Sequence, residues 1–243
     1  MTPTFVLVHG AWHGSWCWDT VAQALRDRGA RVYSPSLTGL AERAHLMSPS
    51  VGLATHVQDV LSLIEFERLD GCILVGHSYA GNILTAVADQ LRERVGHYVY
   101  LDAVVPGDDE TRWAWNQFHQ PADRQARLAS IQNAGGGTVL PVPRAEVFGL
   151  RTPEQIRFVQ ARLTPMPAAT YTDVLTFKHG GSSGLRRSYV AGVSPRFPPM
   201  QAVHERLRVS DGWHYHELAG GHDLMITEPD KLAEWLWLLR SHA

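Results

Sequence analysis

The chain has 243 residues, of which 44 % are hydrophobic and 19 % are charged, and its formal net charge is −2. These values fit one globular α/β domain and exclude a disordered chain. Without a basic stripe, nucleic acid is not an expected partner. Two cysteines make no disulfide framework and fit a reducing, cytoplasmic location. The N-terminal apolar run has only the length of a strand, so we expect neither secretion nor a membrane partner.

Predicted strands and helices alternate through the first hundred residues. Strands are expected at 4–9, 31–35, 72–77 and 97–105, and helices at 17–28, 55–67 and 80–95, the second of these capped by Thr55. Two more strands, at 186–193 and 213–220, enclose a helix and precede a final helix with Pro229 in its first turn. This alternation predicts an α/β fold with a mostly parallel sheet flanked by helices.

The alternation breaks between residues 107 and 183, where glycine-rich loops and proline-studded segments such as "LTPMPAATYTD" appear. We predict a core of residues 1–106 and 184–243 and a small helical cap, 107–183, inserted after the strand that ends at Asp102. Such an insertion would cover the C-terminal edge of the sheet, where ligands bind in open α/β folds, and would exclude water from a pocket. The alternative is a second helical layer without a gating role.

The segment "LVGHSYAG" (74–81) places Ser78 between a predicted strand and a predicted helix. A serine on such a sharp turn is held out at the sheet edge, and small neighbours let the chain double back. This nucleophile-elbow pattern has one departure, because Ala80 replaces the glycine expected two residues after the serine, and Gly81 follows. We predict that Ser78 is a nucleophile; otherwise it caps an ordinary helix.

A serine hydroxyl needs a base and its oxyanion needs donors. Among 13 histidines, His222 is the best candidate base, since it follows two glycines in the loop after the last strand, at the sheet edge of Ser78. Gly10 lets the loop after the first strand turn, and the backbone amides of Ala11 and Tyr79 are the predicted oxyanion hole. The alternatives are a loop histidine without a role and a simple strand-ending turn.

These residues resemble the α/β-hydrolase superfamily, and within it the group of plant methylesterases, hydroxynitrile lyases and bacterial esterases, including hydrolases of xenobiotic esters and carbamates. The resemblance is carried by "FVLVHGAWHGSWCW", "PSLTGLAERAHL", "LVGHSYAG", "VYLDAVVPGD" and "ELAGGHDLMITEPDKLAEWL". It implies the α/β-hydrolase fold and a serine hydrolase that uses no cofactor and no metal.

The resemblance also exposes a gap, because the plant members carry the triad acid after the penultimate strand. Here that turn reads "AGVSPRFPPM" (191–200) and contains no Asp or Glu. A triad needs a group that orients the imidazole and stabilises its cation. The site could be inactive, Ser194 could serve as a neutral substitute, or the acid could come from another strand.

Asp102 is our predicted acid. It ends the strand that follows the strand of Ser78, a position from which certain haloalkane dehalogenases, which look similar here, draw their acid. It also preserves the order of nucleophile, acid and base. Asp223 is a weaker rival, because it is adjacent to His222 in sequence, and Asp102 could instead cap the insertion or pair with an arginine. Asp108, Asp109 and Glu110 are expected to form a solvated acidic turn.

The predicted function is hydrolysis of a small, apolar or aromatic carboxylic ester or carbamate ester through an acyl-enzyme on Ser78. Two alternatives stay open: a non-catalytic small-ligand binding protein on the same fold, and a hydroxynitrile lyase. The plant lyases carry Thr and Lys where Gly10 and Asp223 stand. A metallohydrolase would use paired histidines such as "HYH" (214–216), but the rest of a metal motif is missing.

Tryptophans near the predicted mouth indicate an apolar pocket. The predicted pocket comprises Gly10, Trp12, Trp113, Trp115, Thr164 and Pro165, the last two from the only insertion segment that carries the resemblance. The expected partner is a small ester or carbamate substrate, and the chain is expected to be a monomer or a homodimer.

Overall fold

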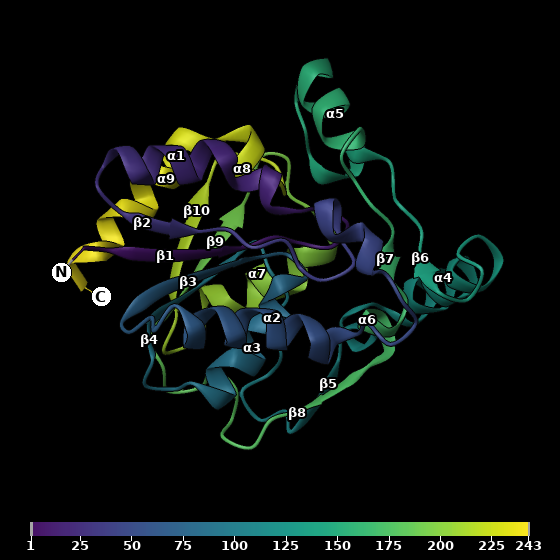
Figure 1. Cartoon of the computed structure of the whole chain (residues 1–243), viewed down its shortest axis with the longest axis horizontal. Helices are drawn as coiled ribbons and strands as arrows, with labels where there is room; N and C mark the ends of the chain where they lie inside the picture. The colour runs from purple at the N-terminus through teal and green to yellow at the C-terminus, as the bar shows by residue number, and fades with distance from the viewer. Residues whose placement is uncertain (1, 243) are drawn as a thin grey trace.

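The computed structural model describes residues 2–242 and is built around a six-stranded sheet (Figure 1). The strands lie in the order β10-β9-β4-β3-β1-β2, and each neighbouring pair is parallel. Their bounds are β1 (Thr4–Val8), β2 (Arg31–Tyr33), β3 (Cys72–His77), β4 (Val95–Leu101), β9 (Arg187–Gly192) and β10 (His214–Leu218). The predicted parallel α/β sheet is confirmed.

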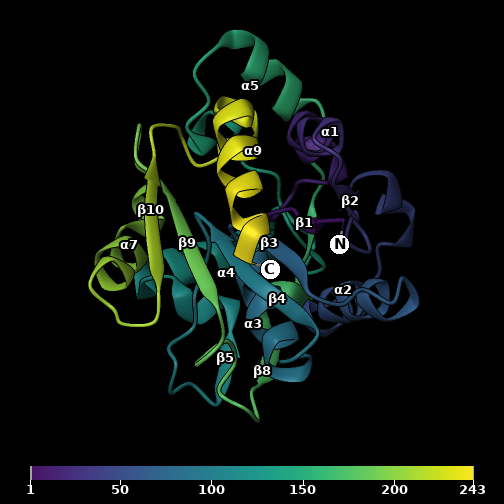
Figure 2. The same cartoon turned by 90° about the vertical axis from the view of Figure 1, so that its left-hand side faces the viewer.

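Helices cover both faces of this sheet. One face carries α1 (Asp19–Asp27), α8 (Leu224–Thr227) and α9 (Pro229–Leu238), and the other carries α2 (Leu53–Phe66), α3 (Ala80–Gln90) and α7 (Gln201–Arg208) (Figures 1 and 2). Successive residues of a strand point to opposite faces. Accordingly Phe5 and Leu7 of β1 join the α1–α9 core, whereas Val6 and Val8 join the α2–α3 core.

The segment between β4 and β9 lies outside the sheet and contains more than helices. Its helices are α4 (Pro121–Asn133), α5 (Pro153–Gln160) and α6 (Ala169–Thr172), and two short antiparallel ribbons pair β5 (Arg112–Ala114) with β8 (Val174–Thr176) and β6 (Val139–Leu140) with β7 (Met166–Pro167). Buried side chains of this segment belong to the same core cluster as α3. The ribbons pair residues far apart in sequence, so local patterns did not predict them.

Short 3₁₀ helices complete the chain: η1 (Ser15–Trp18), η2 (Ala41–Leu46), η3 (Trp115–Phe118), η4 (Ala145–Phe148), η5 (Pro198–Met200) and η6 (Leu239–His242). Among the described helices none is long and apolar enough to cross a membrane.

The start of α2 differs from the prediction. The helix begins at Leu53 with Gly52 as its N-cap, and Thr55 lies at the third helical position. The Thr55 hydroxyl accepts a hydrogen bond from Gly52 N–H at 3.3 Å, and Leu53 N–H donates to Asp173 at 3.0 Å. The insertion therefore caps this helix end, a contact that a local pattern cannot reveal.

Candidate active site

Ser78 lies on the tight turn between β3 and α3, at the carboxyl edge of the sheet. Its φ of +53° is in the left-handed region, which costs an L-residue about 1–3 kcal/mol. Three backbone hydrogen bonds hold the turn: Ser78 N–H donates to Leu101 O at 3.1 Å, and Ser78 O accepts from Gly81 at 3.1 Å and Val104 at 3.0 Å. The strain is thus held by contacts with the neighbouring strand.

Gly81 explains the departure from the usual elbow pattern. A Cβ on Gly81 would lie 1.8 Å from Val104 O, so the close approach of α3 to the chain after β4 needs glycine there. Ala80 is buried and its methyl group is accommodated. The position that requires glycine in this chain is therefore three residues after Ser78.

A chain of two hydrogen bonds joins the three predicted triad residues. His222 Nε2 lies 2.9 Å from Ser78 Oγ, and His222 Nδ1 lies 2.6 Å from Asp102 Oδ2. His222 and Asp102 are both buried. With Nδ1–H donating to the carboxylate, Nε2 of His222 is left to accept the hydroxyl proton of Ser78.

Asp102 follows β4 directly and is fully buried, with a φ of +42°. Its second oxygen, Oδ1, accepts from Gly192 N–H at 3.1 Å and from His204 Nε2 at 2.6 Å. Burial by itself raises the pKa of Asp102, but the hydrogen bonds from His204 and His222 outweigh burial and hold the pKa below 3.8. The carboxylate is therefore charged at neutral pH.

The turn that lacks an acid packs an aromatic ring against the base instead. Phe197 stacks on the His222 ring, with 4.0 Å between the ring centroids. Phe148 of the insertion lies 6.2 Å from the same ring. These two residues were not predicted, and an aromatic side chain in the acid-free turn is the only sequence signal that pointed to Phe197.

Two neutral histidines fix the backbone around the site. His77 Nε2 donates to His222 O at 3.1 Å, and burial, followed by the nearby His222, lowers the pKa of His77 to about 3. His9 Nδ1 donates to Gly10 O at 2.8 Å, and its Nε2 accepts from Leu37 N–H at 3.0 Å. Burial lowers the pKa of His9 to about 3. Both rings act as fixed neutral linkers rather than as bases.

Asp223 pairs with His13 and not with the imidazole of its sequence neighbour. His13 Nε2 lies 3.1 Å from Asp223 Oδ2, and His13 Nδ1 lies 2.8 Å from Ala11 O. Because both ring nitrogens face acceptors, both must donate, and the ring is an imidazolium. Burial by itself lowers the pKa of His13, but the charge of Asp223 raises it above its usual value.

The buried cluster of His77, His222 and Asp223 brings potential metal-ligand atoms within 4.8 Å of one another. However, His222 uses both ring nitrogens in the chain from Ser78 to Asp102, and His77 Nε2 donates to a carbonyl. We interpret the cluster as a hydrogen-bonded support. The histidines of "HYH" lie instead on β10, the edge strand of the sheet, where His216 stacks on Trp235.

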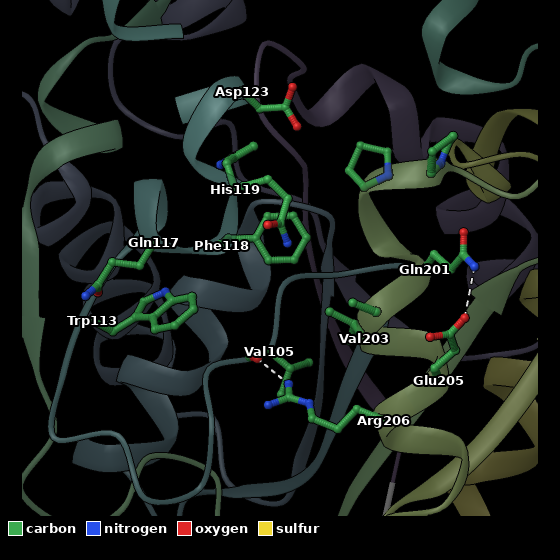
Figure 3. Close-up of a pocket in the computed structure, with 14 residues that line it drawn as sticks. Val105, Trp113, Gln117, Phe118, His119, Asp123, Gln201, Val203, Glu205 and Arg206 are labelled. Carbon is green, nitrogen blue, oxygen red and sulfur yellow. Dashed lines mark hydrogen bonds between the residues drawn. The ribbon is translucent and has the colours of Figure 1, made fainter. Parts of the chain in front are cut away.

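Two adjoining cavities lie at the site, and the inner one reaches Ser78. The inner one, of about 30 Å³, is lined by Ser78, His222 and an apolar wall that includes Trp12, Trp115, Phe148, Phe197 and Met200. The outer one, of about 610 Å³, is bounded by insertion residues such as Trp113 and Gln117 on one side and by α7 residues such as Val203 and Glu205 on the other (Figure 3). The two cavities share Phe118, His119 and Pro199.

Comparison with known proteins places this site in a family. The model of the alpha/beta hydrolase family matches residues 5–235. The chain belongs to this family. The predicted resemblance and fold class are thereby confirmed.

Similar proteins include enzymes that cleave esters. The chain is 38 % identical over 237 residues to the carbendazim hydrolyzing esterase of Nocardioides sp. (strain SG-4G), which covers 96 % of this chain and 97 % of that protein. It is 28 % identical to methyl jasmonate esterase 1 of Vitis vinifera, covering 66 % of each chain. These relatives support a serine hydrolase of carboxylic esters, of the Ser-His-Asp type typical of the family.

A solved structure extends the likeness to the fold. An extracellular α/β-hydrolase from a Paenibacillus species, described as sharing structural and functional homology with tobacco salicylic acid binding protein 2, superposes with a TM-score of 0.80. The sequence identity is 24 %, and the match covers 96 % of this chain and 97 % of that one. The likeness therefore concerns the arrangement of the sheet, its helices and the insertion.

The predicted oxyanion hole of the hydrolase lies where the β1 loop meets the elbow. A Cβ on Gly10 would lie 2.7 Å from His77 Nδ1 and 3.1 Å from Ser78 Cβ, so the backbone at Gly10 abuts the nucleophile. Tyr79 is anchored by a hydrogen bond of 3.0 Å from its hydroxyl to His56 Nδ1. The assignment of the Ala11 and Tyr79 amides as oxyanion donors stays a prediction.

Three of the six predicted pocket residues line a cavity, and the other three do not. Trp12 and Trp115 line the inner cavity and Trp113 lines the outer one. Thr164 instead joins the insertion to the core: its N–H donates to Trp12 O at 2.9 Å, and its hydroxyl accepts from Ala41 N–H at 3.1 Å. Neither cavity, as lined by described residues, includes Gly10, Thr164 or Pro165.

Proposed function

We propose that Ser78, His222 and Asp102 form the catalytic triad and that hydrolysis proceeds through an acyl-enzyme on Ser78. The observation that carries the proposal is the unbroken chain from Ser78 Oγ through His222 to Asp102, with contacts of 2.9 and 2.6 Å. A serine so placed can lose its proton to the imidazole as it attacks. The charged Asp102 stabilises the imidazolium that results.

The path of the proton and the departure of the alcohol follow from this geometry. Ser78 Oγ bonds to the substrate carbonyl carbon while its proton passes to His222 Nε2, and the same proton then goes to the departing alcohol. Water, deprotonated by His222, attacks the acyl-enzyme and releases Ser78. The amides of Ala11 and Tyr79 hydrogen-bond the oxyanion in both steps, each worth about 3 kcal/mol in the transition state.

The cavities support a small group at the nucleophile and a larger, apolar or aromatic group outside it. The inner cavity holds about 30 Å³, roughly the space of one water molecule. The outer cavity of about 610 Å³ is in the range that accommodates a drug-sized ligand. A methyl ester or methyl carbamate of an aromatic compound has this division of size. Because a similar protein is a carbendazim hydrolyzing esterase, we propose xenobiotic carbamate esters beside carboxylic esters as substrates.

A hydroxynitrile lyase fits the site less well than a hydrolase. The plant lyases carry a threonine at the position of Gly10, where a Cβ would lie 2.7 Å from His77 Nδ1. They carry a lysine at the position of Asp223, which here is buried against His13. This chain therefore lacks both the threonine and the lysine that the plant lyases carry at the site.

Burst kinetics separate an esterase from a ligand-binding protein. With p-nitrophenyl acetate, the wild type should release one equivalent of p-nitrophenol per chain before steady turnover, and Ser78→Ala should abolish both phases. The matched control, Ser62→Ala on α2, removes a serine away from the site and should leave both unchanged. Saturable binding of the ester without turnover in the wild type would favour the binding protein. A panel of aryl esters, methyl esters and methyl carbamates then ranks the substrates.

We also infer a cytoplasmic enzyme that acts as a monomer or a homodimer. Cys17 and Cys72 are both buried and unpaired in the described chain, which supports a reducing compartment. Light scattering at several protein concentrations decides between the two oligomeric states.

A further inference from the structure

A second histidine, His204, contacts the acid of the proposed triad. It lies on α7, between Val203 and Leu207 of the buried helix face, and its side chain is itself fully buried. His204 Nε2 is 2.6 Å from Asp102 Oδ1, as short as the contact of His222 Nδ1 with Oδ2. Asp102 is thus held between two imidazoles.

The hydrogen bonds assign the proton on His204. A carboxylate only accepts, so His204 Nε2 carries a hydrogen and donates it. Among the described residues His204 Nδ1 has no hydrogen-bond partner, and the ring lies edge-on to Tyr189 at 5.6 Å. A neutral ring with its hydrogen on Nε2 leaves no buried donor unsatisfied. His204 therefore donates one hydrogen bond to Asp102, and it transfers no proton in the reaction.

Asp102 needs the hydrogen bond from His204 because its carboxylate is buried and its Oδ1 has few donors. It is fully buried in a left-handed backbone conformation immediately after β4, and the donors to its Oδ1 are Gly192 N–H at 3.1 Å and His204 Nε2 at 2.6 Å. Without His204, Oδ1 keeps only the longer of these two bonds, and the carboxylate can turn about its Cβ–Cγ bond. A turned carboxylate no longer aims Oδ2 at His222 Nδ1.

We propose that His204 is a positioning residue that fixes the carboxylate plane of Asp102 and thereby orients His222 toward Ser78. The inference rests on the proposed triad. It assigns to α7 a part in the reaction, in addition to the wall that this helix gives the outer cavity in Figure 3. His204 touches neither substrate nor the reacting atoms and acts through Asp102 alone.

The test uses the full chain and p-nitrophenyl acetate. His204→Phe keeps a planar ring but removes the donor, and kcat should fall about 10- to 100-fold, as when a partner that orients a reactive group is lost. KM should stay within about 3-fold, because the substrate is not contacted. His204→Gln restores an N–H donor and should recover kcat to within about 5-fold of the wild type. If the phenylalanine variant does not fold, His204→Met replaces it.

A double-mutant cycle shows through which residue His204 acts. In an Asp102→Asn background, His204→Phe should change kcat by less than about 3-fold, since the carboxylate that it positions is gone. The control is His97→Phe, which removes another buried histidine, bound to Ser188 at 2.8 Å near the opposite sheet edge. It should lower stability but leave kcat near that of the wild type.

Two results overturn the inference. One is a folded His204→Phe or His204→Met enzyme with the kcat of the wild type, and the other is an undiminished loss of kcat in the Asp102→Asn background. Both are distinct from failure of the proposed function, which would appear as a wild type that binds the ester without turnover or as a burst that survives Ser78→Ala.

Discussion

Two buried aspartates flank His222, and each lies between two histidines, yet the structure gives them different surroundings. Asp102 contacts His222 and His204, both at 2.6 Å. Asp223 contacts His13 at 3.1 Å and faces His77 at 3.7 Å. Beside Asp102, His222 directs one ring nitrogen at Ser78. Beside Asp223, both ring nitrogens of His13 are hydrogen-bonded, to Ala11 O and to Asp223 itself. In the proposed triad, the ring nitrogen that His222 directs at the Ser78 hydroxyl therefore distinguishes the Asp102–His222 pair from the Asp223–His13 pair.

The largest expected effect comes from Asp102→Asn. The amide can no longer stabilise the His222 imidazolium and can hold the ring in the wrong tautomer, so kcat should fall by about 10³- to 10⁴-fold. Steady-state kinetics with p-nitrophenyl acetate measure the loss, and circular dichroism checks the fold. A folded variant that keeps most of its kcat would show that Asp102 is not the acid.

Asp223→Asn should act mainly on stability. The change leaves His13 without its charged partner in a fully buried place, and breaking a buried pair costs about 3 kcal/mol or more. Urea unfolding measures this difference. We expect kcat of the folded fraction to fall by less than about 10-fold, because the two ring nitrogens of His222 are hydrogen-bonded to Ser78 and Asp102. A larger loss of kcat than that of Asp102→Asn would reverse the comparison.

Stability should fall as the pH drops from neutrality, because His9 and His77 are buried and stay neutral in the folded protein. An unfolded histidine binds a proton near pH 6.5, whereas His9 and His77 stay neutral in the fold until about pH 3. The unfolded state binds more protons in this window, so at pH 5 each should lower the free energy of unfolding by about 2 kcal/mol. Urea midpoints at pH 7.5, 6 and 5 test the slope, and His9→Gln, which cannot take up a proton, should flatten it.

Asp102, Asp223 and His13 contribute to the free energy of unfolding in other pH ranges. The pKa values of Asp102 and Asp223 are lowered despite burial, by their histidine partners, so their contribution is full above 3.8 and is lost as the pH falls through the folded pKa. The pKa of His13 is raised, since the charge of Asp223 outweighs burial. Its contribution is full below 6.5 and is lost as the pH rises through the folded value.

The smallest expected effect is that of Asp108→Asn, outside both groups. Asp108 is exposed, as expected for the predicted solvated acidic turn, but it also makes two hydrogen bonds of 2.6 Å to the buried Arg187. Asp108 is 49 % exposed, so solvent weakens the pair and the loss should be about 1 kcal/mol. Thermal unfolding measures it, with Asp109→Asn as the neighbouring control. A changed kcat would be unexpected, since Asp108 is not among the described residues that line the two cavities.

The sequence alone predicted the parallel α/β sheet, the elbow at Ser78, His222 and, from the absence of an acid in residues 191–200, the choice of Asp102. These are local signals: a strand pattern, a small-residue turn, glycines before a histidine, and an acid at a strand end. Tertiary structure decided the rest. His204 and Asp102 are 102 positions apart, His13 and Asp223 are 210 apart, and Thr164 bonds to the β1 loop 152 positions away. Helical periodicity places His204 on the buried face of α7, but only the packing of that helix, where the His204 ring meets Tyr189 of β9, brings the ring to the carboxylate.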